Sequence, residues 1–174
     1  IGSGANLQRI YTRGTNSFLA SSTTAAPISL TGDATFTSTG ALTFNGTIDG
    51  AQSLTLSGAT GGSSFNGAIG GATALTSVNF APASGGVISF GNVTTTGAQT
   101  YTHSGGIRTS GAYTSSGGSG IAFSAPVTLI GDTTVNAGAG AATFAGLVTG
   151  NFSLTRTGAG TTTFNGAVGS SALT

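Results

Sequence analysis

Short runs in which apolar and small polar residues alternate recur along the 174-residue chain. In each run two apolar residues stand two positions apart, as in Leu42/Phe44, Ile88/Phe90 and Val127/Leu129. This period of two is typical of a β-strand with one buried face. The runs are short, and Gly, Asn-Gly or Gly-Asp separates them. Because Gly and β-branched residues are also too dense for helices, the pattern predicts an all-β chain of many short strands.

One phrase of four residues recurs among these runs. TFNG occurs at Thr43–Gly46 and at Thr163–Gly166, with near-copies at Ser64–Gly67 (SFNG) and Thr143–Gly146 (TFAG). The alternation turns each aromatic residue inward, which predicts a core built on Phe44, Phe65, Phe144 and Phe164. Asn and Gly tolerate positive φ at low cost, so the Asn-Gly pairs are predicted corners: Asn45, Gly46, Asn66, Gly67, Asn165 and Gly166.

A longer repeat contains these phrases. ISLTGD at Ile28–Asp33 matches VTLIGD at Val127–Asp132 at an offset of 99 residues, and the match continues to the end of the chain. The sequence therefore divides into an N-terminal segment (1–27), a first long repeat (28–126) and a second, incomplete repeat (127–174). Asp33 and Asp132 occupy equivalent Gly-Asp positions, and we interpret them as corner residues rather than as a catalytic pair.

The spacing of the inward aromatic residues favours a β-solenoid. Phe44 and Phe65 are 21 residues apart, and Phe65 and Phe90 are 25 apart. Coils of about 20–25 residues that stack on one another produce such a period. The alternative is a β-sandwich or jelly roll completed by a strand from a neighbouring subunit. That fold would not require an internal copy of 99 residues.

The composition argues against several classes of function. Charged residues make up 4% of the chain and the net charge is +1, so no basic stripe is available for nucleic acid. The sequence contains no run of 18 apolar residues, so we expect no membrane span in this segment. Without Cys, Lys or Glu, and with His103 as the single His, the sequence predicts no enzyme, no cofactor and no metal site. His103 itself is expected on the surface.

The repeats resemble those of a known class of proteins. LTGDATFTSTGALTFNGTIDGAQSLTLSGATGG and GDTTVNAGAGAATFAGLVTGNFSLTRTGAGTTTFNGAVG look like repeats of filamentous-haemagglutinin-like and autotransporter-passenger surface exoproteins of bacteria. The resemblance covers residues 28–76 and 127–174 well, 77–126 loosely and 1–27 hardly at all. It implies a right-handed parallel β-helix, export to the cell surface, and adhesive or structural work. It implies no catalytic residues.

These observations together favour a structural protein, secreted to the surface of a bacterial or archaeal cell, that builds a fibre or an adhesin stalk. Its expected partner is itself, through end-to-end stacking or strand addition. The N-terminal segment would be a cap, a linker or an assembly arm that uses Leu7, Arg9, Ile10, Tyr11 and Arg13.

Two other functions stay open at this point. The first is an adhesin module that binds a glycan or a host surface through exposed aromatic residues, for which Tyr11, Tyr101 and Tyr113 are the candidates. The second is an ice-binding protein that uses outward Thr rows, although the T-x-T pairs stand at unequal places in the sequence.

Overall fold

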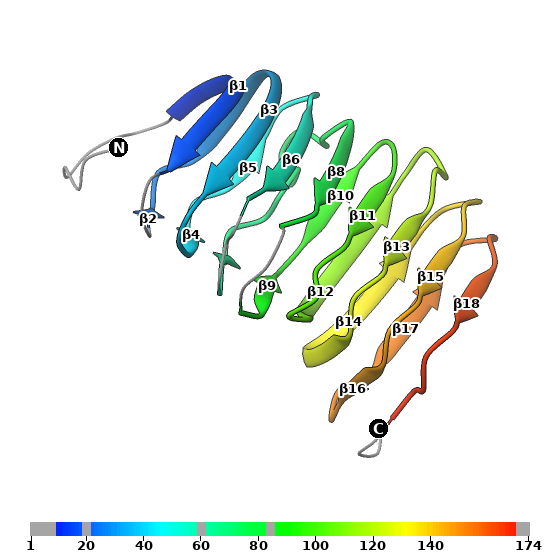
Figure 1. Ribbon diagram of the computed structural model, residues 1–174. Helices are drawn as coiled ribbons and strands as arrows, with labels where there is room; N and C mark the ends of the chain where they lie inside the picture. Colours follow the sequence, from blue (N-terminus) through cyan, green and yellow to red (C-terminus); the bar gives the residue numbers. More distant parts are fainter. Residues whose placement is uncertain (1–9, 19–21, 59–61, 83–85, 170–174) are drawn as a thin grey trace.

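The chain folds into a stack of parallel β-coils, so the predicted all-β solenoid is confirmed (Figure 1). The computed structural model describes residues 10–18, 22–58, 62–82 and 86–169. Within these residues no helix occurs, and every strand pair is parallel. A sandwich or jelly roll is excluded, because those folds are built from antiparallel sheets. About seven coils stack along one axis.

The strands are short and follow one another with few intervening residues. In chain order they are β1 (Ile10–Phe18), β2 (Ser22–Thr24), β3 (Ile28–Ser38), β4 (Leu42–Phe44), β5 (Ile48–Asp49), β6 (Ser53–Ser57), β7 (Ser64–Phe65), β8 (Ser77–Phe80), β9 (Ile88–Phe90), β10 (Val93–Thr95), β11 (Gln99–Tyr101), β12 (Ile107–Ser115), β13 (Ile121–Phe123), β14 (Val127–Asn136), β15 (Ala142–Phe144), β16 (Val148–Gly150), β17 (Leu154–Thr157) and β18 (Thr162–Phe164).

Each coil contributes one segment to each of three ladders, which we number in the order in which the chain visits them. Inward residues that pair in register identify each ladder. The first ladder contains Ile10, Ile28, Ile48, Ile69, Val93, Tyr113, Val135 and Arg156. The second contains Asn16, Phe36, Leu56, Phe80, Tyr101, Phe123, Phe144 and Phe164. The third contains Thr24, Phe44, Phe65, Phe90, Thr109, Leu129 and Gly150.

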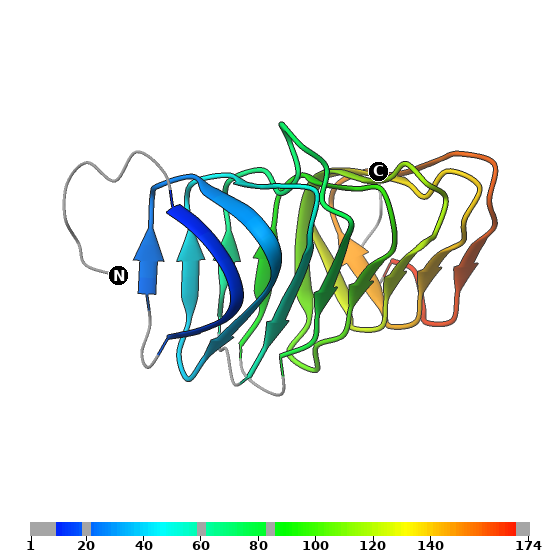
Figure 2. The same cartoon turned by 90° about the horizontal axis from the view of Figure 1, so that it is seen from above.

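Seen from above, the coils lie side by side along the axis of the rod (Figure 2). The core that the three ladders enclose contains a continuous stack of aromatic rings. Phe44 lies 5.4 Å from Phe36 and 5.0 Å from Phe65, measured between ring centroids, and the rings are nearly parallel. The series of ring contacts runs without a break to Phe164, which stacks on Phe144. Burying such a side chain stabilises the fold by about 1.5–3 kcal/mol. The alternation of inward apolar and outward small residues, as in Leu42-Thr43-Phe44, thus produces both the strands and the core.

The Asn-Gly corners require glycine for a reason other than the predicted one. Gly46, Gly67 and Gly166 are not among the glycines with positive φ. Instead, a Cβ atom at Gly67 would lie 2.1 Å from the carbonyl oxygen of Gly46, and one at Gly166 would lie 2.4 Å from that of Gly146. Glycine is needed because the corners of successive coils stack backbone against backbone. Asn45 and Asn66 stack beside them through a side-chain hydrogen bond of 2.7 Å.

The Gly-Asp positions lie at bends inside long strands. β3 and β14 each pass from one ladder to the next without interruption. At these bends Asp33 accepts a hydrogen bond from the Ser53 backbone N–H (2.8 Å), and Asp132 accepts one from that of Ser153 (3.0 Å). Each carboxylate therefore ties its own coil to the following coil.

The two copies of the long repeat lie on different ladders. From Ile28 the chain makes four full coils to reach Tyr113 in the same ladder, and it then crosses the second ladder to reach Val127 in the third. The repeat unit is therefore one segment shorter than five full coils, so the second copy begins on a different ladder from the first. As a result Phe44 lies in the third ladder, whereas its sequence counterpart Phe144 lies in the second.

Candidate functional site

The N-terminal end of the rod is a coil with a polar interior. Residues 10–18 and 22–24 are part of the solenoid, because β1 pairs with β3 and β2 pairs with β4. The inward residues of this first coil are mostly polar where those of the second coil are apolar: Thr12 stacks on Leu30, Asn16 on Phe36, Ser22 on Leu42 and Thr24 on Phe44. This arrangement is typical of the terminal repeat that covers the end of a solenoid core.

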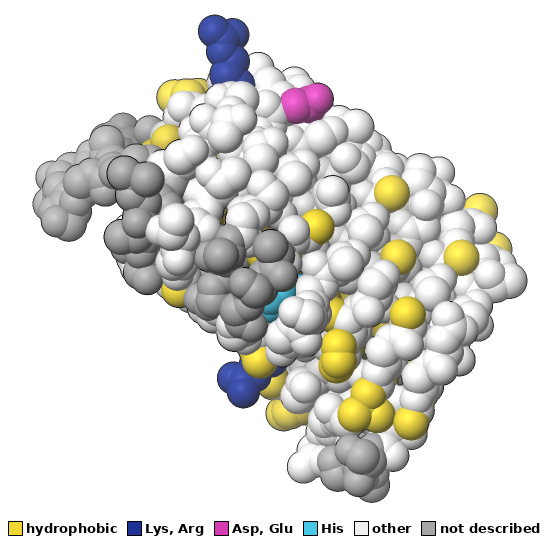
Figure 3. All heavy atoms as spheres, in the orientation of Figure 1, with side chains coloured by type: hydrophobic (Ala, Val, Ile, Leu, Met, Phe, Trp, Pro, Cys, Tyr) yellow, Lys and Arg dark blue, Asp and Glu magenta, His cyan; other side chains and the backbone are white. Residues whose placement is uncertain are grey.

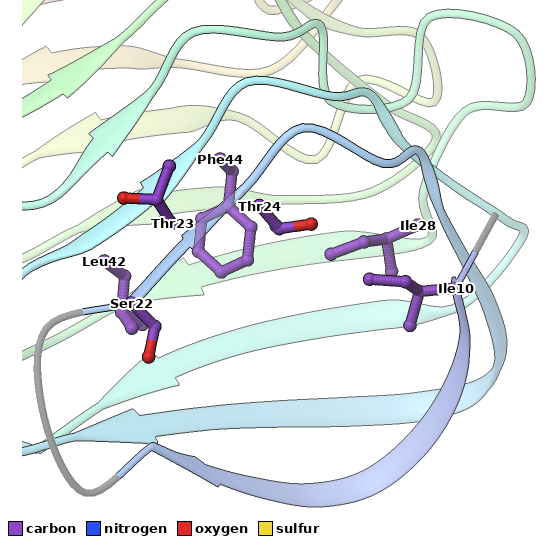
Figure 4. A pocket seen from close by; sticks show the side chains of 7 residues that line it. All are labelled: Ile10, Ser22, Thr23, Thr24, Ile28, Leu42 and Phe44. Carbon is purple, nitrogen blue, oxygen red and sulfur yellow. The ribbon is translucent and has the colours of Figure 1, made fainter. Parts of the chain in front are cut away.

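A small hollow of about 20 Å³ lies at this end (Figure 4). Its lining is Ile10, Ser22, Thr23, Thr24, Ile28, Leu42 and Phe44. The volume suffices for about one water molecule. We therefore assign it no ligand.

The proposed assembly arm is only partly described. Leu7 and Arg9 lie outside the described residues. Ile10 packs against the core, whereas Tyr11 is 70% exposed and Arg13 is exposed on the same strand. Over residues 10–18 the N-terminal segment forms β1, which pairs with β3 as part of the first coil.

The C-terminal end differs from the N-terminal end, because inward side chains are left uncovered there. Phe164 is 43% exposed and Val168 is 42% exposed, although their counterparts Phe65 and Ile69 in the first copy are buried. Phe164 was predicted in the core. It keeps its stacking contact with Phe144, but no described strand pairs with the outer side of β18.

Arg156 occupies an inward position in this last coil. Its counterpart in the first copy is Leu56, which is fully buried. The Arg156 Nη2 donates to the backbone oxygens of Gly140 (3.2 Å) and Gly160 (3.3 Å). Its Nε and Nη1 are buried and have no hydrogen-bond partner among the described residues. The sequence already contained this signal, as LTRT where the first copy has LTLS.

The face of the rod shown in Figure 3 carries few charged side chains, in keeping with a chain in which 4% of the residues are charged. One outward row in the second ladder is mostly Thr: Thr15, Thr35, Thr55, Asn79, Thr100, Ala122, Thr143 and Thr163. In the sequence the T-x-T pairs stand at unequal places. In the structure Thr35 and Thr100 nevertheless share one row of the second ladder, whereas Thr155 lies in the first ladder.

The candidate aromatic ligand-binding row does not exist, because Tyr101 and Tyr113 are fully buried. The Tyr101 hydroxyl donates to Gln99 Oε1 (3.0 Å), and the Tyr113 hydroxyl donates to the Phe90 backbone oxygen (3.2 Å). Burial raises the pKa of both hydroxyls, and Tyr113 adds to the effect on Tyr101. Both therefore stay neutral and act as polar members of the core. Strand alternation alone does not show that Tyr101 and Tyr113 are buried, because Tyr occurs on either face of a strand.

His103 is also buried, contrary to the sequence prediction. Its Nε2 lies 2.6 Å from the Gly86 backbone oxygen, and its Nδ1 has no partner among the described residues. Within the same part of the chain, no three His, Cys, Asp or Glu side chains gather closely enough to hold a metal ion.

One apolar patch distinguishes the surface of the second copy. Ile130, Leu147 and Phe152 are exposed, and Ile130 and Phe152 border a shallow hollow on the third ladder. The corresponding residues of the first copy are Thr31, Thr47 and Gln52. The patch is thus a feature of one copy and not of the repeat.

Comparisons with known proteins found no matching family, no matching curated protein and no matching solved structure. In the described residues there is also no helix with the length and apolarity needed to cross a membrane.

Proposed function

We propose that the chain is a segment of an extracellular structural rod, namely a surface fibre or the stalk of an adhesin on a bacterial or archaeal cell. The observation that carries this proposal is the aromatic stack, which continues from Phe36 to Phe164 through coil after coil. Stacked parallel coils satisfy their backbone groups along the rod and can be extended by the same rule. The resemblance of the repeats to surface exoproteins supports the location.

The shift of the repeat by one ladder agrees with a stalk better than with a one-sided binding surface. A residue peculiar to one strand of the unit lies on a different face in the next copy, as Asp49 in the first ladder and Thr149 in the third illustrate. Features of the unit therefore rotate around the rod. Only the core continues along one line.

The length of rods built from more copies of the unit tests this proposal. Proteins with one, two and three copies of residues 28–126 between residues 1–27 and 127–174 are imaged by electron microscopy over a range of concentrations. Coils stack about 4.8 Å apart, so each added unit should lengthen the rod by about 22 Å at constant width. Particles that widen instead of lengthening would contradict a rod. Filaments that grow with concentration would show that copies also stack end to end.

The outward Thr row supports one second candidate, an ice-binding face. Thr occupies most positions of the row, although Asn79 and Ala122 interrupt it. Thermal hysteresis of the purified chain measures this activity. Hysteresis that disappears with Thr55→Val and Thr100→Val would replace the structural proposal with this function.

A further inference from the structure

The C-terminal end of the rod combines exposed inward residues with an unpaired charge. Phe164 and Val168 are partly exposed on the last coil, and Arg156 lies inward on the same coil. From these groups we infer that this end receives a further parallel coil that presents a carboxylate to Arg156 and an aromatic ring to Phe164. The inference deepens the proposed rod, because it states how the rod continues.

The aromatic half of the inference follows from the ladders. Every ring of the second ladder between Phe80 and Phe144 has a ring of a neighbouring coil stacked on it, and the centroids of Tyr101 and Phe123 are 4.7 Å apart. Phe164 has such a partner, Phe144, on one side. In the first copy its counterpart Phe65 is covered on the other side by Phe90 at 5.1 Å. A ring in the incoming coil would reproduce this contact.

The carboxylate half follows from Arg156. A guanidinium carries five N–H donors and stays charged in proteins, and a buried charge without a partner is costly. The two carbonyl oxygens that Nη2 reaches leave Nε and Nη1 unpaired. A carboxylate is the side chain that matches both the charge and the donors.

The first coil of a second copy does not fit this end. Its described inward residues include Thr12, Asn16 and Thr24, which offer neither an aromatic ring nor a carboxylate. The three Asp carboxylates of the chain already accept backbone hydrogen bonds elsewhere. The incoming coil therefore differs from the N-terminal coil, and the rod has a direction.

Extension of the chain at this end tests the inference. The sequence that follows the counterpart of the C terminus in the first copy, residues 77–126, is appended after Thr174. In this segment the copy of Phe80 falls opposite Arg156, because Phe80 pairs with Leu56, and the copy of Phe90 falls opposite Phe164. A second extended protein carries Phe80→Glu in the appended segment only. Both are also made with Arg156→Leu in the body of the rod.

The preference for the appended residue should reverse with residue 156. With Arg156, the extension with Glu should melt higher than the extension with Phe, by on the order of 3–10 °C. With Arg156→Leu, the extension with Phe should melt higher. The backbone amides of residues 162–164 should gain protection from hydrogen exchange in all extended proteins. This readout keeps the test valid if one variant is unstable.

Two results would overturn the inference. One is a preference for Phe in both backgrounds, and the other is unchanged exchange at residues 162–164 on extension. Head-to-tail oligomers of the unextended chain, seen by sedimentation and abolished by Phe164→Ala, would mean instead that a second copy occupies this end. If the extension fails although multi-copy proteins still form rods that lengthen by unit, the inference fails and the structural proposal stands.

Discussion

The first and second copies of the long repeat fold into the same local arrangement on different faces of the rod. In the first copy β3 pairs with β5 and β6, and in the second β14 pairs with β16 and β17 in the same way. Yet β5 belongs to the first ladder and β16 to the third. The strands, bends and corners thus follow from local sequence, whereas the face on which they lie follows from the number of segments that precede them.

The differences between the copies are concentrated where the second copy approaches the end of the rod. Leu56, Asp49 and Phe65 of the first copy are buried. Their counterparts Arg156, Thr149 and Phe164 are partly or largely accessible. For side chains that point into the core, position along the rod therefore affects the energetic weight of a residue as well as the repeat does, and the following predictions test that statement.

The largest difference is expected for the aromatic pair Phe65 and Phe164. Phe65 stacks on Phe44 and Phe90 and contacts the tilted ring of Phe80, with centroids 5.0–5.2 Å apart. Phe65→Ala should lower the free energy of unfolding by about 3–5 kcal/mol through loss of burial and a cavity. Phe164→Ala should cost about 1–2 kcal/mol. Urea denaturation of both variants measures the gap, and equal losses would show that the last coil is as well packed as the middle.

An intermediate effect on stability is expected at Asp49, whose counterpart in the second copy is Thr149. Asp49 is buried and accepts hydrogen bonds from the backbone N–H groups of Ala72 (2.8 Å) and Thr73 (3.3 Å). Asp49→Thr should destabilise the protein by about 1.5–3 kcal/mol, since bonds to a charged acceptor are lost. The reverse exchange, Thr149→Asp, should leave stability within about 0.5 kcal/mol. Denaturant midpoints of the pair measure this, and a gain of stability from Thr149→Asp would contradict it.

The corner glycines should behave alike in both copies. Gly67→Ala and Gly166→Ala each place a methyl group against a backbone carbonyl, so each should cost about 1–3 kcal/mol. Gly91 is the control, because a Cβ atom there would meet its nearest neighbour at 3.9 Å. Gly91→Ala should be neutral in thermal unfolding. A cost at Gly91 equal to that at Gly67 would mean that conformation, not close approach, selects glycine.

The smallest effect is expected from pH. Hydrogen bonds from the backbone N–H and then the hydroxyl of Ser153 lower the pKa of Asp132 below its usual value. Because the folded-state pKa is the lower one, this stabilisation is present above about pH 4 and is lost as pH falls through the folded pKa. Asp132→Asn should remove that slope. Thermal unfolding between about pH 2 and 6 measures it, and an unchanged slope in the variant would contradict the assignment.

Sequence reasoning reached the fold because strand alternation, coil spacing and the long repeat all report on local structure. It placed Phe44, Phe65 and Phe144 inward for the same reason. It placed His103 on the surface and considered Tyr101 and Tyr113 as candidates for an exposed row, because polarity alone does not reveal a hydroxyl or ring nitrogen that finds a hydrogen-bond partner inside. Sequence reasoning also could not show the shift between the copies, because an offset of 99 residues does not reveal how many strand segments the unit contains.

Engineered disulfides test the shift most directly, because the natural chain has no Cys. Ala122 and Thr143 pair in the second ladder, and Thr128 and Thr149 pair in the third. Double-cysteine variants at these two pairs should form internal disulfides under mild oxidation, seen by mass and gel mobility. The pair Thr114 and Thr128 should stay reduced, because Thr114 lies on the first ladder and Thr128 on the third. A disulfide between 114 and 128, with none between 122 and 143, would show that the second copy begins on the same ladder as the first and would contradict the account.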